Sequence, residues 1–240
     1  MTSITQVGTF KQSAATATNP GVVNTPSGAA AGDLLIFFVG FYLDSTTSTT
    51  TITPPSGAVL VPGSRVDHVL GSDNYIASAM YTLSLTGTPA SSYTFSLSPS
   101  GTYGVGVTCV CLRSADPMSP IDTKSVNDGN SNTPTATGVT IAGSNEWLFL
   151  FFLGDSNSVV NTNFPSFSYY FITDSGGNDK TYASFAVAWG VGVIQNITTG
   201  ATGNYQATLS ASDDWITSLI AIKPNNNIVL PTDSMFFGMT

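Results

Sequence analysis

The side chains that could carry out chemistry are few in this chain of 240 residues. The only imidazole belongs to His68, in the stretch SRVDHVL. Nucleophilic catalysis needs a base that is held beside its nucleophile. The neighbouring Asp67 would point to the opposite face of a strand, because side chains alternate along a strand. We therefore interpret His68 as a surface residue or as one whose hydrogen bonds are satisfied, and not as a catalytic base.

Two groups of carboxylates could be considered for glycoside hydrolysis, which needs a pair of acids a few ångströms apart in a cleft. Asp213 and Asp214 precede a predicted strand, and Asp174 and Asp179 share one predicted loop. Adjacent aspartates in loops are usually turn formers. We therefore expect no catalytic residue and no enzyme activity.

A calcium loop is a further alternative, because Asp128, Asn130 and Asn132 in DGNSN offer oxygen ligands at alternate positions. The segment lacks the following glycine and the distal glutamate of an EF-hand. The segment 174–179, DSGGND, is incomplete in the same way. We expect no cofactor.

The two cysteines, Cys109 and Cys111, stand two apart in a strand-like stretch and would point from the same face. Their Cα atoms would then lie about 7 Å apart, a spacing that strains a disulfide. Zinc would need about four ligands at suitable spacing, and no such set stands near them. We expect buried thiols and no metal site.

Composition narrows the class of protein. Charged residues make up 8% of the chain, and fourteen acids stand against six scattered bases, for a formal net charge of −8. Scattered bases do not favour a nucleic acid as partner. The chain has a single glutamate, Glu146, so helix should be a minor component. The first residues, MTSITQVGTF, do not resemble a Sec signal, and the longest apolar run is about half a membrane span. We expect a soluble protein that is made in a cytoplasm and has no membrane partner.

Two strongly apolar runs dominate the pattern, Leu34 to Leu43 (LLIFFVGFYL) and Trp147 to Leu153 (WLFLFFL). Gly40 is the only gap in the first run. A strand of this kind has both faces away from water. The two runs predict two core strands that lie about half a chain apart, and hence two related halves.

A weak internal repeat supports this interpretation. Tyr93 to Ser98 (YTFSLS) aligns with Tyr205 to Ser210 (YQATLS) at an offset of 112 residues. Tyr103 then aligns with Trp215, although only four of the twenty positions from 93 to 112 are identical. Similar β-patterning without duplication remains the alternative.

The predicted fold class is all-β, a jelly-roll-like β-sandwich of eight to ten strands in which two related halves interleave in both sheets. Two tandem immunoglobulin-like domains are the alternative. The predicted organisation is an N-terminal strand and arm (1–31), a sandwich (32–224) with halves 32–113 and 145–224 joined by turns at 114–144, and a C-terminal arm (225–240).

The C-terminal segment, NNNIVLPTDSMFFGMT, follows the last predicted strand and contains Met235, Phe236, Phe237 and Met239. These four side chains are too apolar for a free tail. We predict that they make assembly contacts. Folding back onto the same chain is the alternative.

The order GDLLIFF, TPPSG, YIASAMYTLS, SSYTFSLS and GVGVTCVCLRSADPMSPID resembles a β-sandwich module of virion proteins from tailed bacteriophages. The resemblance covers roughly residues 30–125, with an echo in 145–224. Where some modules have a tryptophan after the Pro-Pro loop, this chain has Ala58. The matched positions are Gly32, Asp33, Pro54, Pro55, Tyr93 and Arg113.

The resemblance implies a virion structural protein, made in the host cytoplasm and located in the virion. A capsid cement or decoration protein is the preferred interpretation, with the major capsid protein as partner and a homotrimer as the assembly. A tail or fibre receptor-binding module that binds carbohydrate through loop aromatics such as Tyr42, Tyr169 and Tyr170 is the alternative.

Overall fold

The computed structural model describes residues 3–13, 19–44, 50–70, 74–98, 104–154, 166–171, 188–209 and 211–226. Within these ranges every regular element is a strand, and every strand pairing is antiparallel. The all-β prediction is therefore confirmed. The strands are β1 (Thr5–Gln6), β2 (Lys11–Gln12), β3 (Gly21–Asn24), β4 (Leu34–Asp44), β5 (Thr51–Thr53), β6 (Val59–Leu60), β7 (Val66–Leu70), β8 (Asn74–Ser84), β9 (Ser92–Ser98), β10 (Gly104–Arg113), β11 (Ile121–Ser131), β12 (Thr135–Ala136), β13 (Thr140–Ile141), β14 (Glu146–Gly154), β15 (Ser168–Phe171), β16 (Ala188–Ile197), β17 (Gly200–Ala201), β18 (Tyr205–Gln206) and β19 (Asp213–Ile222).

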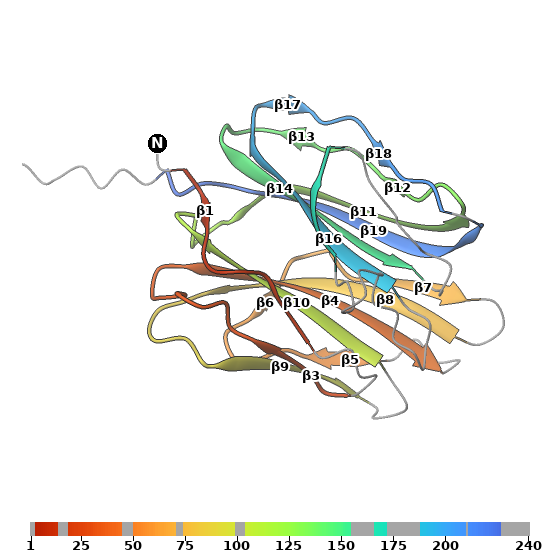
Figure 1. Cartoon of the computed structure of the whole chain (residues 1–240), viewed down its shortest axis with the longest axis horizontal. Coiled ribbons are helices and arrows are strands. Elements are labelled where there is room, and N and C mark those ends of the chain that lie inside the picture. Colours follow the sequence, from red (N-terminus) through yellow and green to blue (C-terminus); the bar gives the residue numbers. More distant parts are fainter. Residues whose placement is uncertain are drawn as a thin grey trace, which may run out of the picture.

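The strands form four layers, which Figure 1 shows from the side. The first large sheet has the order β1-β10-β4-β8-β6, with β2 also on β10 and β7 also on β8. The second large sheet, β11-β19-β14-β16-β15, faces it across the middle of the molecule. A small sheet, β3-β9-β5, covers the outer face of the first large sheet, and the pairs β12-β18 and β13-β17 cover the outer face of the second.

The strand order identifies a jelly roll in the first half and a related order in the second. We number the strand positions of a half along the chain, and count β1 with β2 and β6 with β7 as single positions. The first large sheet then has the order 1-8-3-6-5, and its small sheet has the order 2-7-4. Apart from position 5, which pairs at the edge of the large sheet, this is jelly-roll order. The second large sheet, β11-β19-β14-β16-β15, likewise places the first strand of its half beside the last, followed by β14 and β16.

The fold is thus a jelly-roll-like β-sandwich that is built from two related halves. One detail of the prediction was wrong, because the halves do not interleave: each large sheet takes its strands from one half. The physical reason lies in the two apolar faces of each core strand. One face packs within its own half, and the other packs against the opposite half, so no exchange of strands is needed to keep both faces dry.

Strand β4 shows this division of faces residue by residue. Ile36 and Phe38 belong to the central core between the two large sheets, whereas Phe37 and Val39 belong to the core of the first half. All four side chains are fully buried. In β14 the same alternation sends Trp147, Phe149 and Phe151 to the central core and Leu148, Leu150 and Phe152 to the second half.

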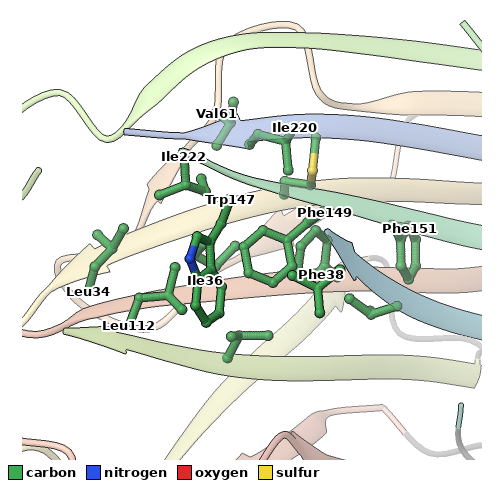
Figure 2. Packing of buried hydrophobic residues seen from close by; sticks show 14 of the residues in the cluster. Leu34, Ile36, Phe38, Val61, Leu112, Trp147, Phe149, Phe151, Ile220 and Ile222 are labelled. Atoms are coloured by element: carbon green, nitrogen blue, oxygen red, sulfur yellow. The ribbon is translucent and has the colours of Figure 1, made fainter. Parts of the chain in front are cut away.

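Aromatic rings connect the halves in the central core (Figure 2). Phe38 stacks on Phe151, with ring centroids 5.7 Å apart, and lies 5.9 Å from Phe149. Gly40 makes room for the opposite sheet, because a Cβ there would lie 3.0 Å from Leu153 Cδ1. The single gap in the apolar run of β4 is therefore a packing position.

Residues that are matched by the predicted offset of 112 lie in the outer cores of their own halves, and the duplication itself stays a prediction. Leu97 and Leu209 are both buried, each in the core of its own half. The ring of Tyr93 packs edge-on against Phe37 at 5.3 Å. The ring of Tyr205 packs edge-on against Phe167 at 4.8 Å.

Two predicted irregular segments contain strands. The predicted N-terminal strand and arm, 1–31, includes β3, which pairs with β9. The segment 114–144, expected to consist of turns, includes the eleven-residue strand β11 at the edge of the second large sheet. Half-exposed edge strands need few apolar residues, so the apolar pattern did not mark them. The domain boundaries stay predictions, and residues 227–240 of the C-terminal segment lie outside the described residues.

Replacing Gly138 by alanine should destabilise the second half. A Cβ at Gly138 would lie 2.1 Å from the carbonyl oxygen of Gly203, so the backbone would have to move. We expect a loss of about 1–3 kcal/mol in the free energy of unfolding, the usual range for overpacking. Thermal unfolding measures it against Gly87→Ala, where a Cβ would meet nothing within 4 Å. Equal melting temperatures for the two variants would contradict the close approach.

Candidate functional site

The single histidine lies where the two halves meet. His68 is the middle residue of β7, and its side chain is 13% exposed. Val66 and Leu70, on the same face of the strand, pack into the central core. This face of β7 therefore places the imidazole against the second large sheet, where β7 contacts β11 and β19.

Two aspartates of the second half hold the imidazole. His68 Nδ1 lies 2.6 Å from Asp128 Oδ2 of β11, and His68 Nε2 lies 2.9 Å from Asp214 Oδ1 of β19. Asn130 Nδ2 also donates to Asp214 Oδ1, at 2.9 Å. When both aspartates are ionised they can only accept, so each ring nitrogen then donates an N–H and the imidazole carries its charge. We call His68, Asp128, Asp214 and Asn130 the histidine clasp.

The electrostatics agree with this protonation state. Burial by itself would lower the pKa of His68, since it disfavours the charged form. The hydrogen bonds and charges of Asp214 and Asp128 outweigh burial and raise the pKa of His68 above its ordinary value. The clasp is thus a charged link between the halves, at the margin of an otherwise apolar interface.

The arrangement links the two halves. Both ring nitrogens of His68 are engaged by carboxylates, so neither is free to take a proton from a nucleophile. Charge-assisted hydrogen bonds of this kind are stronger than neutral ones and fix the geometry of their partners. The clasp therefore fixes β7 against β11 and β19.

The structure brings together three residues that the sequence offered separately. His68 was expected to be a surface residue or one whose hydrogen bonds are satisfied. Asp214 was considered as half of a carboxylate pair, and Asp128 as a calcium ligand. Asp128 and Asn130, which were weighed as ligands of a calcium loop, lie in strand β11 and belong to the clasp. The sequence carried no signal for the clasp, since its members come from strands up to 146 residues apart.

Among the described residues, no group of three or more His, Cys, Asp or Glu side chains could hold a metal ion. Asp174 and Asp179 lie outside the described residues. Cys109 and Cys111 are free and buried, as predicted, and both pack in the core of the first half. Burial raises the pKa of the Cys111 thiol to about 12, which leaves it unreactive near neutral pH.

A second acidic site was missed by the sequence analysis. Glu146, the only glutamate, is fully buried at the start of β14 and accepts a hydrogen bond from the Gly143 amide at 3.0 Å. Burial first, and then the neighbouring Asp122, raise the pKa of Glu146 to about 7, although the Gly143 hydrogen bond acts against them. Its place before an apolar strand does not by itself indicate burial.

The aromatic residues proposed for carbohydrate binding are not in loops. Tyr42 lies in β4, and its half-buried side chain packs against the central core. Tyr169 and Tyr170 lie in β15, at the edge of the second large sheet. The proposed assembly residues Met235, Phe236, Phe237 and Met239 lie outside the described residues.

Two residues of the virion-module resemblance form an ion pair. The side chain of Asp33 is 2% exposed. Its carboxylate accepts hydrogen bonds from Arg113 Nε and Nη2, both at 2.8 Å. Arg113 also donates to the Gly28 carbonyl at 3.1 Å. The pair fixes the residue before β4 to the last residue of β10, so these matched positions are structural.

Comparisons with known proteins do not identify a family for this chain. No family model matches the sequence, and no curated protein matches it. One solved structure, described as "Crystal Structure of the STIV MCP", has a TM-score of 0.25 and 8% sequence identity, over 92% of this chain and 96% of that chain. A likeness this weak carries neither fold nor function to this chain. In the described part of the chain, no helix has the length and apolar character needed to cross a membrane.

Proposed function

We propose that this chain is a structural protein of a tailed-bacteriophage virion, and more specifically a capsid cement or decoration protein. In this role it binds the major capsid protein and stabilises the head shell. The observation that carries the proposal is the bidentate pair of Asp33 with Arg113. It joins the two ends of the motif series through which the sequence resembles virion modules, and it has a structural role.

The organisation of the halves supports a structural role as well. Two jelly-roll halves are sealed face to face by an apolar core, and the histidine clasp adds a charged link at its margin. The apolar core and the clasp stabilise the folded protein and, in the proposed role, the virion. The clasp also keeps both ring nitrogens of His68 hydrogen-bonded. We propose no enzyme activity for the chain.

We further propose a homotrimer, because capsid lattices offer local threefold positions and closed symmetric oligomers are the common form of assembly. The apolar residues Met235, Phe236, Phe237 and Met239 are the proposed assembly contacts. A surface with few charges suits a protein that is covered by neighbours.

The number of copies per virion tests the proposal. Quantitative mass spectrometry of purified particles should find hundreds of copies if the protein decorates the shell. Purified protein should also bind to shells that lack it and raise the temperature at which they open. A few copies per particle, with binding to host cells instead of shells, would overturn the cement role and favour the tail or fibre module.

A further inference from the structure

A shallow groove of about 320 Å³ lies beside β6, at the edge of the first large sheet. One wall comes from β6 and from the two residues that follow it, Val61 and Pro62. The other wall comes from the connection between β10 and β11. Val59, Leu60, Pro117, Met118, Pro120 and Ile121 are among the residues that line the groove.

Large apolar side chains are exposed in this groove. Val59, Leu60 and Met118 are 63%, 38% and 86% exposed. Five large hydrophobic side chains are exposed in the described part of the chain, and these three line one groove. None of the lining residues is charged. A gathering of exposed apolar side chains marks an interaction surface for an apolar partner.

The groove also offers a sheet edge. Strand β6 pairs with β8 and is the last strand in the order of its sheet. An edge strand can accept an additional strand, which then adds backbone hydrogen bonds to the side-chain contacts. The partner that fits best is thus an extended apolar segment with little charge.

The C-terminal segment of this chain has that chemistry. Beyond Asn226 it reads NIVLPTDSMFFGMT, with one charged residue, Asp233. Ile228 to Leu230 is suited to strand pairing. Met235, Phe236, Phe237 and Met239 supply the apolar side chains.

The path of the last described residues decides which copy supplies the segment. Lys223 N donates to the carbonyl of Pro120, a residue of the groove, but Asn225 N donates to the carbonyl of Ser114, beyond the end of β10. The chain therefore leaves in the direction away from the groove. Strands β4 and β8 lie between β10 and β6, a separation of about 14 Å at the usual strand spacing.

Docking within the same chain would require a sharp reversal directly after Asn226. Residues 228–230 lie three to five residues beyond Asn225, a span of about 10–18 Å at most, so after such a reversal they would reach β6 only if the chain ran almost straight. A neighbouring copy needs no such reversal. We propose that the groove binds the C-terminal segment of a second copy of this chain.

This inference rests on the homo-oligomer of the proposed function and names its interface. An arm of one copy in the groove of the next is a head-to-tail contact, which closes into a ring if the rotation permits. A ring also gains avidity, since each copy is then held by its own arm and by a neighbour's.

The experiment uses purified protein without capsids, and sedimentation velocity as the readout. Val59→Asp with Met118→Asp places charges in the groove, at exposed positions where folding is not at risk. Val22→Asp, at a 44% exposed position in β3, is the matched control. A chain ending at Asn226 lacks the arm. Melting temperatures verify that each variant is folded.

We expect oligomers from the full chain and from Val22→Asp, and monomers from the groove variant and from the shortened chain. A mixture of the two monomeric variants should form a one-to-one complex, because one intact arm then meets one intact groove. Oligomers from the shortened chain, or no complex in the mixture, would overturn the inference. A monomeric full chain would also overturn it, and binding of a peptide of residues 227–240 to the shortened chain would then indicate docking within one chain. Capsid binding is measured separately, so failure here leaves the cement role open to its own test.

Discussion

Replacing Phe38 by alanine should lower the free energy of unfolding by about 3–5 kcal/mol, the range for deleting a buried phenylalanine. Phe38 is fully buried, and its ring packs on Phe149 and Phe151 of the other half. The substitution therefore opens a cavity between the two large sheets. Equilibrium unfolding in urea, followed by tryptophan fluorescence and by circular dichroism, measures the loss.

A double-mutant cycle locates the effect. Phe38 and Phe151 stack on each other, so their alanine variants should be coupled by about 0.5–3 kcal/mol. Phe37 is the matched control, since it is equally buried but points into the core of the first half. Its alanine variant should add to Phe151→Ala within about 0.5 kcal/mol. Additivity of Phe38 with Phe151 would contradict the face-to-face packing of the halves.

The second large effect is a decline in stability as pH rises through neutrality. The folded pKa of His68 lies above the unfolded value of 6.5. A group of this kind contributes its full stabilisation below the unfolded pKa and loses it as pH rises through the folded pKa. Glu146 acts in the same direction at lower pH, between about 4.5 and about 7. The variant Glu146→Gln should remove the lower part of the decline and keep the part above 6.5.

His68→Gln should abolish the remaining decline, because glutamine carries no charge and can donate to only one aspartate. At pH 6 it should cost about 1–3 kcal/mol, the range for losing hydrogen bonds to charged partners. Because the chain has one histidine, a single set of imidazole NMR resonances reports the pKa directly. Asp214→Asn should lower that pKa. Asp67→Asn, which removes an equal charge from the exposed pair with Arg65, is the control. An unchanged histidine pKa in Asp214→Asn would contradict the clasp.

Much of the first half could be predicted from the sequence, because apolar and polar residues alternate regularly along its strands. Tyr93, Phe95 and Leu97 alternate with polar residues in the sequence and are buried, and the alternate residues of β8 face the core of the first half. The two faces of β4 were recognised as dry. The sequence of β4 does not show which segment packs on its second face. The side chains that do so, such as Phe149 and Phe151, lie more than 100 residues further along the chain.

The candidate site was harder to predict, for a related reason. Local pattern reveals which face a side chain occupies but not which distant strand lies opposite. Asp128 in β11 was read as part of a loop because DGNSN has turn composition, yet pairing with β19 extends it. Tertiary pairing thus overrode local preference. Glu146 was missed because a lone acid before an apolar run does not indicate that it will be buried.

The face-to-face arrangement has a consequence for synthesis. The last strand of the first half ends at Arg113, but β19, which helps to cover its inner face, ends at Ile222, 109 residues later. At about 5–20 residues per second, a ribosome needs roughly 5–20 s to add that length. During this time Ile36 and Phe38 have no partner sheet on the nascent chain. The first half should therefore be a client of ribosome-associated chaperones, and slowing translation between the halves should lower the yield of folded protein.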